Sequence, residues 1–322
     1  MMENLVFGVD IGGTTIKMAL ITEKAVIVDK WEIPTNTTNK GTNIIPDIAA
    51  SIKGSMVQRE LSNEHVLGIG VGAPGPVNMQ TGILYTAVNL GWDQPVALRD
   101  ELQQLTGLSV VIDNDANVAA LGEMWKGAGD GARDVVFVTL GTGVGGGVIV
   151  NGDIVHGSKG AAGEIGHITV VQETGYLCNC GKTGCLETVA SATGVVRLAT
   201  DALASNNTES ALRNILLDAG HITAKDIFDL ARTDDPIAYE TVQKLSTYLG
   251  LSLANLGSAL NPDKIVLGGG VSKAGETLLN PLREKFKQYA FSTVAESTAI
   301  EIATLGNDAG VYGAAWLVKY KH

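Results

Sequence analysis

The first residues whose types and spacing could do chemistry form a glycine-rich turn near the N-terminus, between Asp10 and Lys17. Two adjacent glycines leave backbone amides uncovered, two threonines add hydroxyl donors, and a lysine adds a cation, which together suit a phosphate group. An aspartate at the end of the preceding strand is placed to hold Mg²⁺ through water. The predicted phosphate-site residues are Asp10, Gly12, Gly13, Thr14, Thr15 and Lys17. A plain hairpin turn with two glycines is the alternative interpretation.

A second glycine-rich turn runs from Leu140 to Gly147 and contains the spacing G-x-G-x-x-G. A dinucleotide site would require a helix to begin there, so that its N-terminus meets the pyrophosphate. The β-branched residues from Val148 to Val150 predict a strand instead, which favours a second phosphate-binding hairpin at Gly141, Thr142 and Gly143. A third cluster follows a predicted strand, and its Gly269 and Gly270 could lie flat against a nucleobase or ribose.

All three cysteines of the chain fall in one short loop, at Cys178, Cys180 and Cys185, and His167 precedes them. Three thiolates and one imidazole are the four ligands that a closed, structural Zn²⁺ site prefers. The second ring nitrogen of His167 would then be held in a fixed direction, available to a substrate. Buried free thiols are the alternative interpretation.

A run of carboxylates and amides, Asp113-Asn-Asp-Ala-Asn117, starts like a calcium-binding EF-hand loop. That loop requires glycine at its sixth position and glutamate at its twelfth, where this chain has Val118 and Met124, so calcium is excluded at this site. These residues either cap a helix or present polar groups to a ligand. With Glu164 and Glu187 they would suit the vicinal hydroxyls of a polyol.

Both halves of the chain open with the same pattern, which is a strand, a glycine turn and a second strand. Alternation and β-branching predict strands at Leu5–Val9, Ile16–Ile21, Ala25–Ile33, Val66–Val71, Ser109–Ile112, Asp134–Leu140, Gly147–Val150, Asp153–Val155, Lys264–Leu267 and Ala299–Thr304. Helical spacing predicts helices at Asn43–Leu61, Gln94–Thr106, Ala116–Lys126, Ala274–Tyr289 and Ala309–Tyr320, and mainly helices between Thr188 and Leu260.

This duplicated pattern predicts an α/β protein with two lobes around a cleft, in which ligands bind near the carboxyl ends of strands. We expect residues 1–114 to form the first lobe, completed by a C-terminal helix at 306–322. Residues 115–305 would form the second lobe and carry the zinc-binding loop at 167–187. The expected hinge lies near Asp113–Ala116.

The charge, the N-terminus and the cysteines of the chain exclude several classes of protein. Acidic residues outnumber basic ones by 34 to 23, a formal charge of −11, which is the wrong sign for neutralising nucleic acid or an anionic membrane surface. The N-terminus has no basic or apolar signal segment. Three clustered cysteines do not form a secreted disulfide framework, so we expect a cytoplasmic protein with reduced thiols.

Together these motifs resemble the ROK family (repressors, open reading frames, kinases) of the sugar kinase and actin superfamily. The resemblance covers essentially the whole chain. It is carried by D-x-G-G-T at Asp10, Ala73-Pro-Gly-Pro76, Asn114-Asp-Ala-Asn117, the L-G-T-G-x-G-G-G hairpin, E-x-G-H at Glu164, C-x-C-G-x-x-G-C-x-E at Cys178, and the late G-G-G. It implies the two-lobed, actin-like (ribonuclease H-like) ATPase fold with duplicated domains.

The resemblance is strongest to bacterial ATP-dependent glucokinases, and it implies ATP and Mg²⁺ as well as structural Zn²⁺. It implies that Asp115 is the catalytic base, that Asn114, Glu164, His167 and Glu187 hold the sugar, and that Gly75 and Asn89 line the sugar pocket. His167 with Cys178, Cys180 and Cys185 would bind the zinc.

Two alternatives remain open. The same hydroxyl-binding residues could serve a kinase for N-acetylmannosamine, N-acetylglucosamine or another hexose. A sugar-sensing regulator without activity is the second alternative, although ROK repressors carry an additional N-terminal winged-helix domain and the phosphate motif here starts at Asp10. We expect a homodimer or a higher homo-oligomer.

Overall fold

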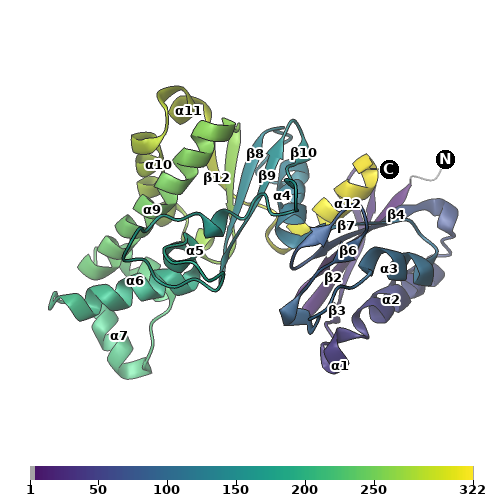
Figure 1. Cartoon of the computed structure of the whole chain (residues 1–322), viewed down its shortest axis with the longest axis horizontal. Helices are drawn as coiled ribbons and strands as arrows, with labels where there is room; N and C mark the ends of the chain where they lie inside the picture. Colours follow the sequence, from purple (N-terminus) through teal and green to yellow (C-terminus); the bar gives the residue numbers. More distant parts are fainter. Residues whose placement is uncertain (1–3, 322) are drawn as a thin grey trace.

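The computed structural model describes residues 4–321, and it contains two five-stranded sheets of the same topology. In the first sheet the strand order is β3-β2-β1-β4-β7, and in the second it is β10-β9-β8-β11-β12. The first three strands of each order are antiparallel neighbours, and the last two run parallel to β1 or β8. The duplicated, two-lobed, actin-like α/β fold predicted from the sequence is confirmed (Figure 1).

The first lobe contains β1 (Leu5–Ile11), β2 (Thr15–Thr22), β3 (Ile27–Pro34), α1 (Thr38–Gly41), α2 (Ile44–Gln58), β4 (Val66–Ala73), β5 (Val77–Asn78), β6 (Ile83–Leu84), α3 (Leu98–Thr106) and β7 (Val110–Asn114). Helix α4 (Asp115–Lys126) leads to the second lobe. That lobe contains β8 (Val135–Leu140), β9 (Val144–Val150), β10 (Asp153–Ile154), α5 (Glu187–Ala190), α6 (Ala192–Ser205), α7 (Ala211–Ala219), α8 (Ala224–Ala231), α9 (Pro236–Leu260), β11 (Lys264–Gly268), α10 (Glu276–Tyr289), α11 (Ser292–Ser297) and β12 (Ala299–Ile302). The chain ends in α12 (Ala309–Lys321).

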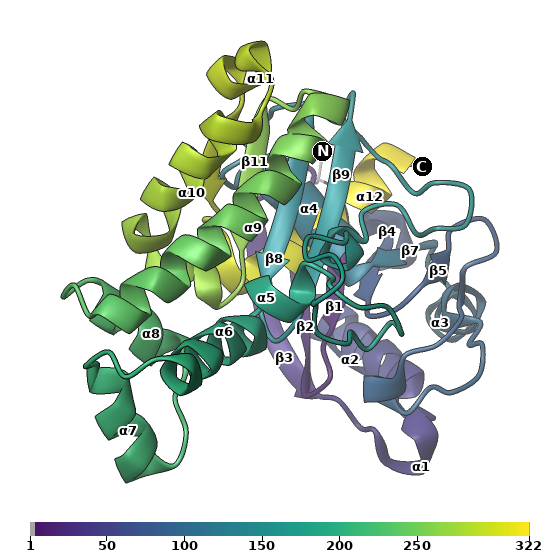
Figure 2. The ribbon, with the colours of Figure 1, turned by 60° about the vertical axis from the view of Figure 1, so that its left-hand side comes forward.

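The elements stack in layers, with α4 and α12 between the two sheets. One face of the first sheet packs on α2 and α3, and its other face packs on α12. The second sheet packs on α4 and α12 with one face and on the helices from α5 to α10 with the other. Figure 2 shows α9 and α10 along that outer face. The helices that join the lobes therefore form the wall between the two sheets.

Glycines in the strands allow α12 to lie unusually close to the first sheet. A Cβ on Gly8 would stand 2.2 Å from the carbonyl oxygen of Val311, and one on Gly70 would stand 1.8 Å from that of Ala314. No side chain fits at such distances, so both positions require glycine. Helix α12 thereby buries its small residues against β1 and β4.

Two of the differences from the sequence prediction have a clear physical reason. Strand β9 begins at Val144 and not at Gly147, so Gly145 and Gly146 belong to a strand and not to the predicted turn. These two glycines are required by packing, because a Cβ on Gly145 would lie 2.9 Å from the Cγ2 of Thr139 and one on Gly146 would lie 2.7 Å from the Gly163 carbonyl oxygen. Helix α3 starts at Leu98 and not at Gln94, since the chain before it forms a β-bridge between Val96 and Leu84.

Among residues 4–321, no helix has both the length and the apolar character needed to cross a lipid bilayer.

Candidate active site

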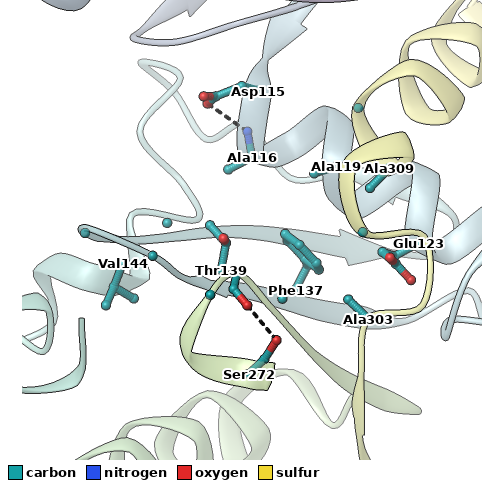
Figure 3. A pocket seen from close by; sticks show the side chains of 18 of the residues that line it. Asp115, Ala116, Ala119, Glu123, Phe137, Thr139, Val144, Ser272, Ala303 and Ala309 are labelled. Atoms are coloured by element: carbon teal, nitrogen blue, oxygen red, sulfur yellow. Dashed lines mark hydrogen bonds between the residues drawn. The ribbon is translucent and has the colours of Figure 1, made fainter. Parts of the chain in front are cut away.

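A cleft of about 700 Å³ lies between the lobes, at the carboxyl ends of β1, β8 and β11 (Figure 3). Both lobes line it, since Asp10 and Lys17 come from the first and the glycine clusters from the second. The predicted site residues that line it are Asp10, Lys17, Asp115, Gly141, Gly143, Glu164, His167, Glu187, Gly269 and Gly270. Residues separated by more than 250 positions in the sequence thus meet in one cavity.

Asp10 lies near the end of β1, directly across from Lys17 on β2. The Lys17 Nζ is 4.0 Å from the Asp10 Oδ2. Burial raises the pKa of Asp10, and the charge of Lys17 partly offsets this effect. The carboxyl group occupies the space beside Gly310 of α12, because a Cβ there would lie 2.5 Å from the Asp10 Cγ. A cation or phosphate-bound metal at this position would favour the ionised form of Asp10.

The second hairpin is fixed by Glu187, the first residue of α5. Its Oε2 accepts a hydrogen bond from the Val144 amide at 3.0 Å and fills the space where a Cβ on Gly143 would lie, 2.4 Å away. Across the cleft, Gly269 has a φ of +84°, and Ser272 Oγ donates to its carbonyl at 2.8 Å. The two glycine segments are therefore held in defined positions before any ligand binds.

The sequence left open whether Asn114 and Asp115 cap a helix or present polar groups to a ligand, and the two residues differ in this respect. Asn114 is the N-cap of α4, because its Oδ1 accepts hydrogen bonds from the amides of Ala116 at 2.9 Å and Asn117 at 3.4 Å. Asp115 is the first helical residue, and its Oδ1 accepts from the Ala116 amide at 2.8 Å (Figure 3). The helix is thus capped by Asn114, so the second carboxylate oxygen of Asp115 is not needed for capping.

Burial raises the pKa of Asp115 to about 6, and the nearby charge of Asp10 acts in the same direction. The hydrogen bond from the Ala116 amide opposes both effects. Asp115 is therefore ionised at neutral pH but is a stronger base than an exposed aspartate.

A smaller cavity of about 170 Å³ adjoins the cleft and is lined by Gly75, Asn114, Asp115 and Glu164. The Asn114 Nδ2 donates to the Gly75 carbonyl at 3.2 Å. Gly75 has a φ of +100°, and a Cβ there would stand 2.1 Å from the carbonyl oxygen of Thr86. Asp115 and Glu164 line both cavities, so a ligand in the small one would face a ligand in the large one across Asp115.

A partly buried pair, formed by Asp113 and His156, supports this region. Asp113, at the end of β7, accepts hydrogen bonds from the Asn114 amide at 2.7 Å and the Asn117 Nδ2 at 3.0 Å. Its other oxygen lies 2.8 Å from the Nε2 of His156, in the chain after β10. This contact ties the segment that precedes Glu164 to the turn that carries Asp115.

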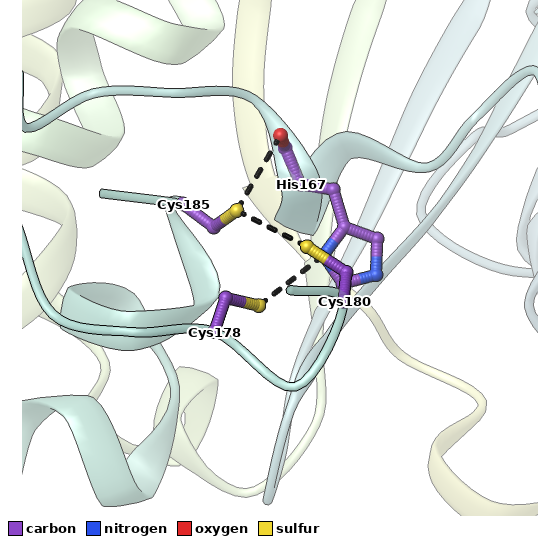
Figure 4. Close-up of side chains that lie close together, drawn as sticks. All are labelled: His167, Cys178, Cys180 and Cys185. Atoms are coloured by element: carbon purple, nitrogen blue, oxygen red, sulfur yellow. Dashed lines mark hydrogen bonds between the residues drawn. The ribbon is translucent and has the colours of Figure 1, made fainter. Parts of the chain in front are cut away.

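The cysteines and His167 converge in one cluster, whose ligand atoms all lie within 4.8 Å of one another (Figure 4). Cys178 Sγ is 3.6 Å from His167 Nδ1, and Cys180 Sγ is 3.6 Å from Cys185 Sγ. Tetrahedral zinc with Zn–S of about 2.3 Å and Zn–N of about 2.1 Å requires edges of roughly 3.6 to 3.8 Å. The four residues therefore fit a zinc ion, and the other ring nitrogen of His167 lies 3.8 Å from Glu164 Oε2.

Some predicted residues are outside these cavities. Within residues 4–321, the linings of the two cavities do not include Gly12, Gly13, Thr14, Thr15, Thr142 or Asn89. A Cβ on Gly13 would nevertheless stand 3.5 Å from the Asn89 Nδ2, so these two predicted residues are neighbours in the first lobe. The sequence reasoning in turn missed cleft residues, namely Glu123, Ser272, Lys273, Asn307 and Gly310. Ser272 and Lys273 come just after the third glycine cluster, which was the signal that could have indicated them, and Gly310 lies in a helix rich in glycine and alanine. Glu123 and Asn307 stand in no motif.

Comparison with known proteins gives a consistent result. The ROK family model matches residues 6–321. A glucokinase of Halalkalibacterium halodurans is 55% identical over 97% of this chain and 94% of its own length. An N-acetylgalactosamine kinase of a Shewanella species is 32% identical over 97% of this chain and 96% of its own length.

Among solved structures, a ROK family glucokinase from Streptomyces griseus in complex with glucose and AMPPNP matches with a TM-score of 0.76 and 37% identity. That match covers 98% of this chain and 99% of the other. Since both the family model and these relatives extend along almost the entire sequence, the chain belongs to the ROK family.

Proposed function

We propose that this chain is an ATP-dependent glucokinase, which transfers the γ-phosphoryl group of ATP to the C6 hydroxyl of glucose and forms glucose 6-phosphate. The observation that carries the proposal is the position of Asp115, which borders both the large cleft and the small cavity. A base at that junction can act on a hydroxyl in the small cavity while a phosphate lies in the cleft. The 55% identity with a glucokinase along nearly the whole chain supports glucose as the sugar.

ATP would occupy the large cleft. Its phosphates would contact Lys17, Gly141 and Gly143, which line the cleft. The other predicted hairpin residues, which lie outside its lining, would complete the phosphate site from the two sides: Gly12, Gly13, Thr14 and Thr15 on one and Thr142 on the other. Gly269 and Gly270 would contact the ribose or the base. Asp10 is the residue that would hold a magnesium ion, through water, and such an ion neutralises charge on the phosphates during transfer.

Glucose would occupy the small cavity. Carboxylates accept hydrogen bonds from hydroxyl groups, while amides both accept and donate them. Asn114 and Glu164, which line this cavity, and Glu187, which lines the adjoining cleft, therefore suit a polyol. Gly75 and Asn89 would lie at the edge of this pocket. The Nε2 of His167 faces Glu164, and the metal cluster fixes the direction of that ring.

Asp115 would accept the proton of the C6 hydroxyl as the oxygen bonds to phosphorus. Phosphoryl transfer passes through a loose, highly anionic transition state, so positioning and charge neutralisation account for most of the catalysis. A pKa of about 6 keeps Asp115 ionised at neutral pH, as a base must be. Water could accept the phosphoryl group as well, so we expect the lobes to close when glucose binds.

Zinc would have a structural role in this enzyme. His167, Cys178, Cys180 and Cys185 would enclose it completely, which leaves no open position for a substrate. The cluster joins the loop at residues 167–187 to the start of α5, where Glu187 holds the second hairpin. Loss of the metal should therefore disturb both the sugar site and the phosphate site.

Three further predictions belong to the same proposal. The division into residues 1–114 with 306–322 and residues 115–305 would place the hinge at the start of α4. The cytoplasm is the expected location, because it supplies ATP and keeps thiols reduced. A homodimer or higher homo-oligomer is the expected assembly, which sedimentation would test.

The substrate is tested by comparing glucose with hexoses altered at C2. A site built around a hydroxyl rejects an altered group strongly, so glucose should give the highest kcat/KM. If N-acetylmannosamine or N-acetylglucosamine gave a higher value, the glucose assignment would be wrong while the kinase assignment stood. Failure of every hexose to accept phosphate, despite tight binding of one, would instead support the sugar-sensing alternative.

A further inference from the structure

Glu123 is a buried acidic residue to which the proposed mechanism gives no role. It lies in the third turn of α4, and its side chain is 0% exposed. Its Oε2 accepts hydrogen bonds from the amides of Ala128 at 2.9 Å and Thr304 at 3.1 Å, and its Oε1 accepts from the amide of Leu305 at 2.8 Å. Since all three donors are N–H groups, the carboxylate acts purely as an acceptor.

These donors belong to the two segments through which the chain passes between the lobes. Ala128 lies between α4 and β8, where the chain enters the second lobe, and Thr304 and Leu305 lie between β12 and α12, where it returns. Gly127 leaves the space that the carboxylate fills, because a Cβ there would stand 2.0 Å from the Glu123 Oε2. One side chain therefore joins both connections.

The returning segment forms a wall of the cleft. Ala303, Gly306, Asn307, Ala309 and Gly310 all line the large cavity, and Gly310 makes the space for Asp10. Figure 3 shows the Glu123 carboxyl group beside Ala303, in the part of the cleft next to the chain leading to Ala309. Glu123 is eight positions after Asp115 in α4, which corresponds to roughly 12 Å along the helix.

We propose that Glu123 is a positioning residue for the nucleotide: it acts through the segment from Ala303 to Gly310, which it holds against the cleft. Two of its three hydrogen bonds hold the backbone of this segment, whose other contacts include the Ala303 amide with the Leu267 carbonyl at 2.9 Å and the side-chain pair of Lys30 with Asp308. The small sugar cavity contains none of these residues. The inference rests on the proposed function, since it assigns ATP to the large cleft.

The substitution Glu123→Gln tests this role with little change of volume. An amide has one acceptor oxygen, so its NH₂ group must face at least one of the three N–H donors. A lost hydrogen bond to a charged group corresponds to about tenfold or more in affinity. We expect KM for ATP to rise about tenfold while KM for glucose stays within about twofold, and the Thr304 or Leu305 amide to exchange its hydrogen faster.

A matched control separates this effect from general destabilisation. Val242→Ala removes buried methyl groups of α9 from the hydrophobic core of the second lobe, away from both cavities. It should lower the melting temperature without changing either KM. If Glu123→Gln fails to fold, Glu123→Asp keeps the charge, shortens the side chain by one methylene, and should change KM for ATP in the same direction.

Calorimetric titration with a non-hydrolysable ATP analogue makes the test independent of turnover. Weaker binding of the analogue to Glu123→Gln, with glucose binding unchanged, would support the inference even if the sugar substrate were not glucose. Unchanged analogue affinity, or equal weakening for glucose and the analogue, would overturn it. If the wild-type protein phosphorylated no hexose, the proposed function would be refuted. The effect of Glu123→Gln on binding of the ATP analogue would still decide the role of Glu123.

Discussion

Replacing Asp115 with asparagine should have opposite effects on catalysis and on stability. Asparagine keeps the size of the side chain but cannot accept a proton, so turnover should fall by about 100-fold to 10,000-fold. Sugar affinity should change less, because the neighbouring amide and carboxyl groups remain. The protein should at the same time become more stable near pH 8, because the substitution removes a buried charge.

The size of the stability effect follows from the pKa. In the folded protein burial raises the pKa of Asp115 from 3.8 to about 6, so the folded state binds the proton more tightly than the unfolded state. The stability linked to this proton is fully present below pH 3.8 and is lost as the pH rises through about 6. The change of the pKa from 3.8 to about 6 corresponds to at most about 3 kcal/mol at pH 8. Because solvent partly screens the side chain, we expect about 1 to 3 kcal/mol.

The assay combines three measurements on one variant. A coupled assay gives turnover, calorimetry gives glucose affinity, and thermal melting at pH 5 and pH 8 gives stability. Asp115→Asn should melt a few degrees higher than the wild type at pH 8, and about half of this advantage should remain at pH 5. Asp47→Asn, in the first turn of α2, makes the same chemical change away from the cleft and should leave turnover unchanged.

A variant that retained more than about a tenth of wild-type turnover would exclude Asp115 as the catalytic base. The interpretation of Asp115 as a helix cap predicts that outcome, because asparagine caps about as well as aspartate. A lower melting temperature at pH 8 would refute the argument from burial.

The wild-type kcat/KM should fall as the pH drops below about 6, because protonation removes the base; a rate that stayed flat down to pH 5 would contradict the assignment. Cys180→Ser should lose about one zinc per chain, measured by mass spectrometry, together with folding stability; metal-free protein with full activity would refute the zinc site. Gly70→Ala should lower the free energy of unfolding by about 1 to 3 kcal/mol in urea denaturation, because its Cβ would meet the Ala314 carbonyl oxygen at 1.8 Å. The control Gly54→Ala in α2, where a Cβ would have nothing within 4 Å, should be neutral or stabilising. Saturating glucose should reduce the radius of gyration in solution scattering more than ATP does, and an unchanged profile would argue against closure of the lobes.

Local sequence was sufficient to predict the fold class and the position of Asp115. A strand, a glycine turn and a second strand open each half of the chain, and both sheets have the corresponding strand order. Asp115 follows a strand and begins a helix, which is a place where the backbone brings a side chain to a sheet edge. The cysteines lie in one loop, so their convergence with His167 needs few long-range contacts.

Residues that depend on distant contacts could not be predicted in this way. Glu123 looks like an ordinary acidic residue of a helix, and two of its three partners lie 181 and 182 positions further along the chain. Gly146 was assigned to a turn because glycine is common in turns, yet it is in a strand where a Cβ would meet the Gly163 carbonyl oxygen at 2.7 Å. The roles of these residues depend on how helices pack on sheets, and this packing cannot be predicted from the local pattern of one sequence.

The most direct test of the central claim is to incubate the protein with ATP, Mg²⁺ and a panel of hexoses and to identify each product by nuclear magnetic resonance. Glucose should be the best substrate, and the phosphorus should couple to the two protons on C6. Phosphate on another carbon, or transfer to no hexose while ATP is hydrolysed to free phosphate, would contradict a site in which Asp115 takes the C6 proton between the two cavities.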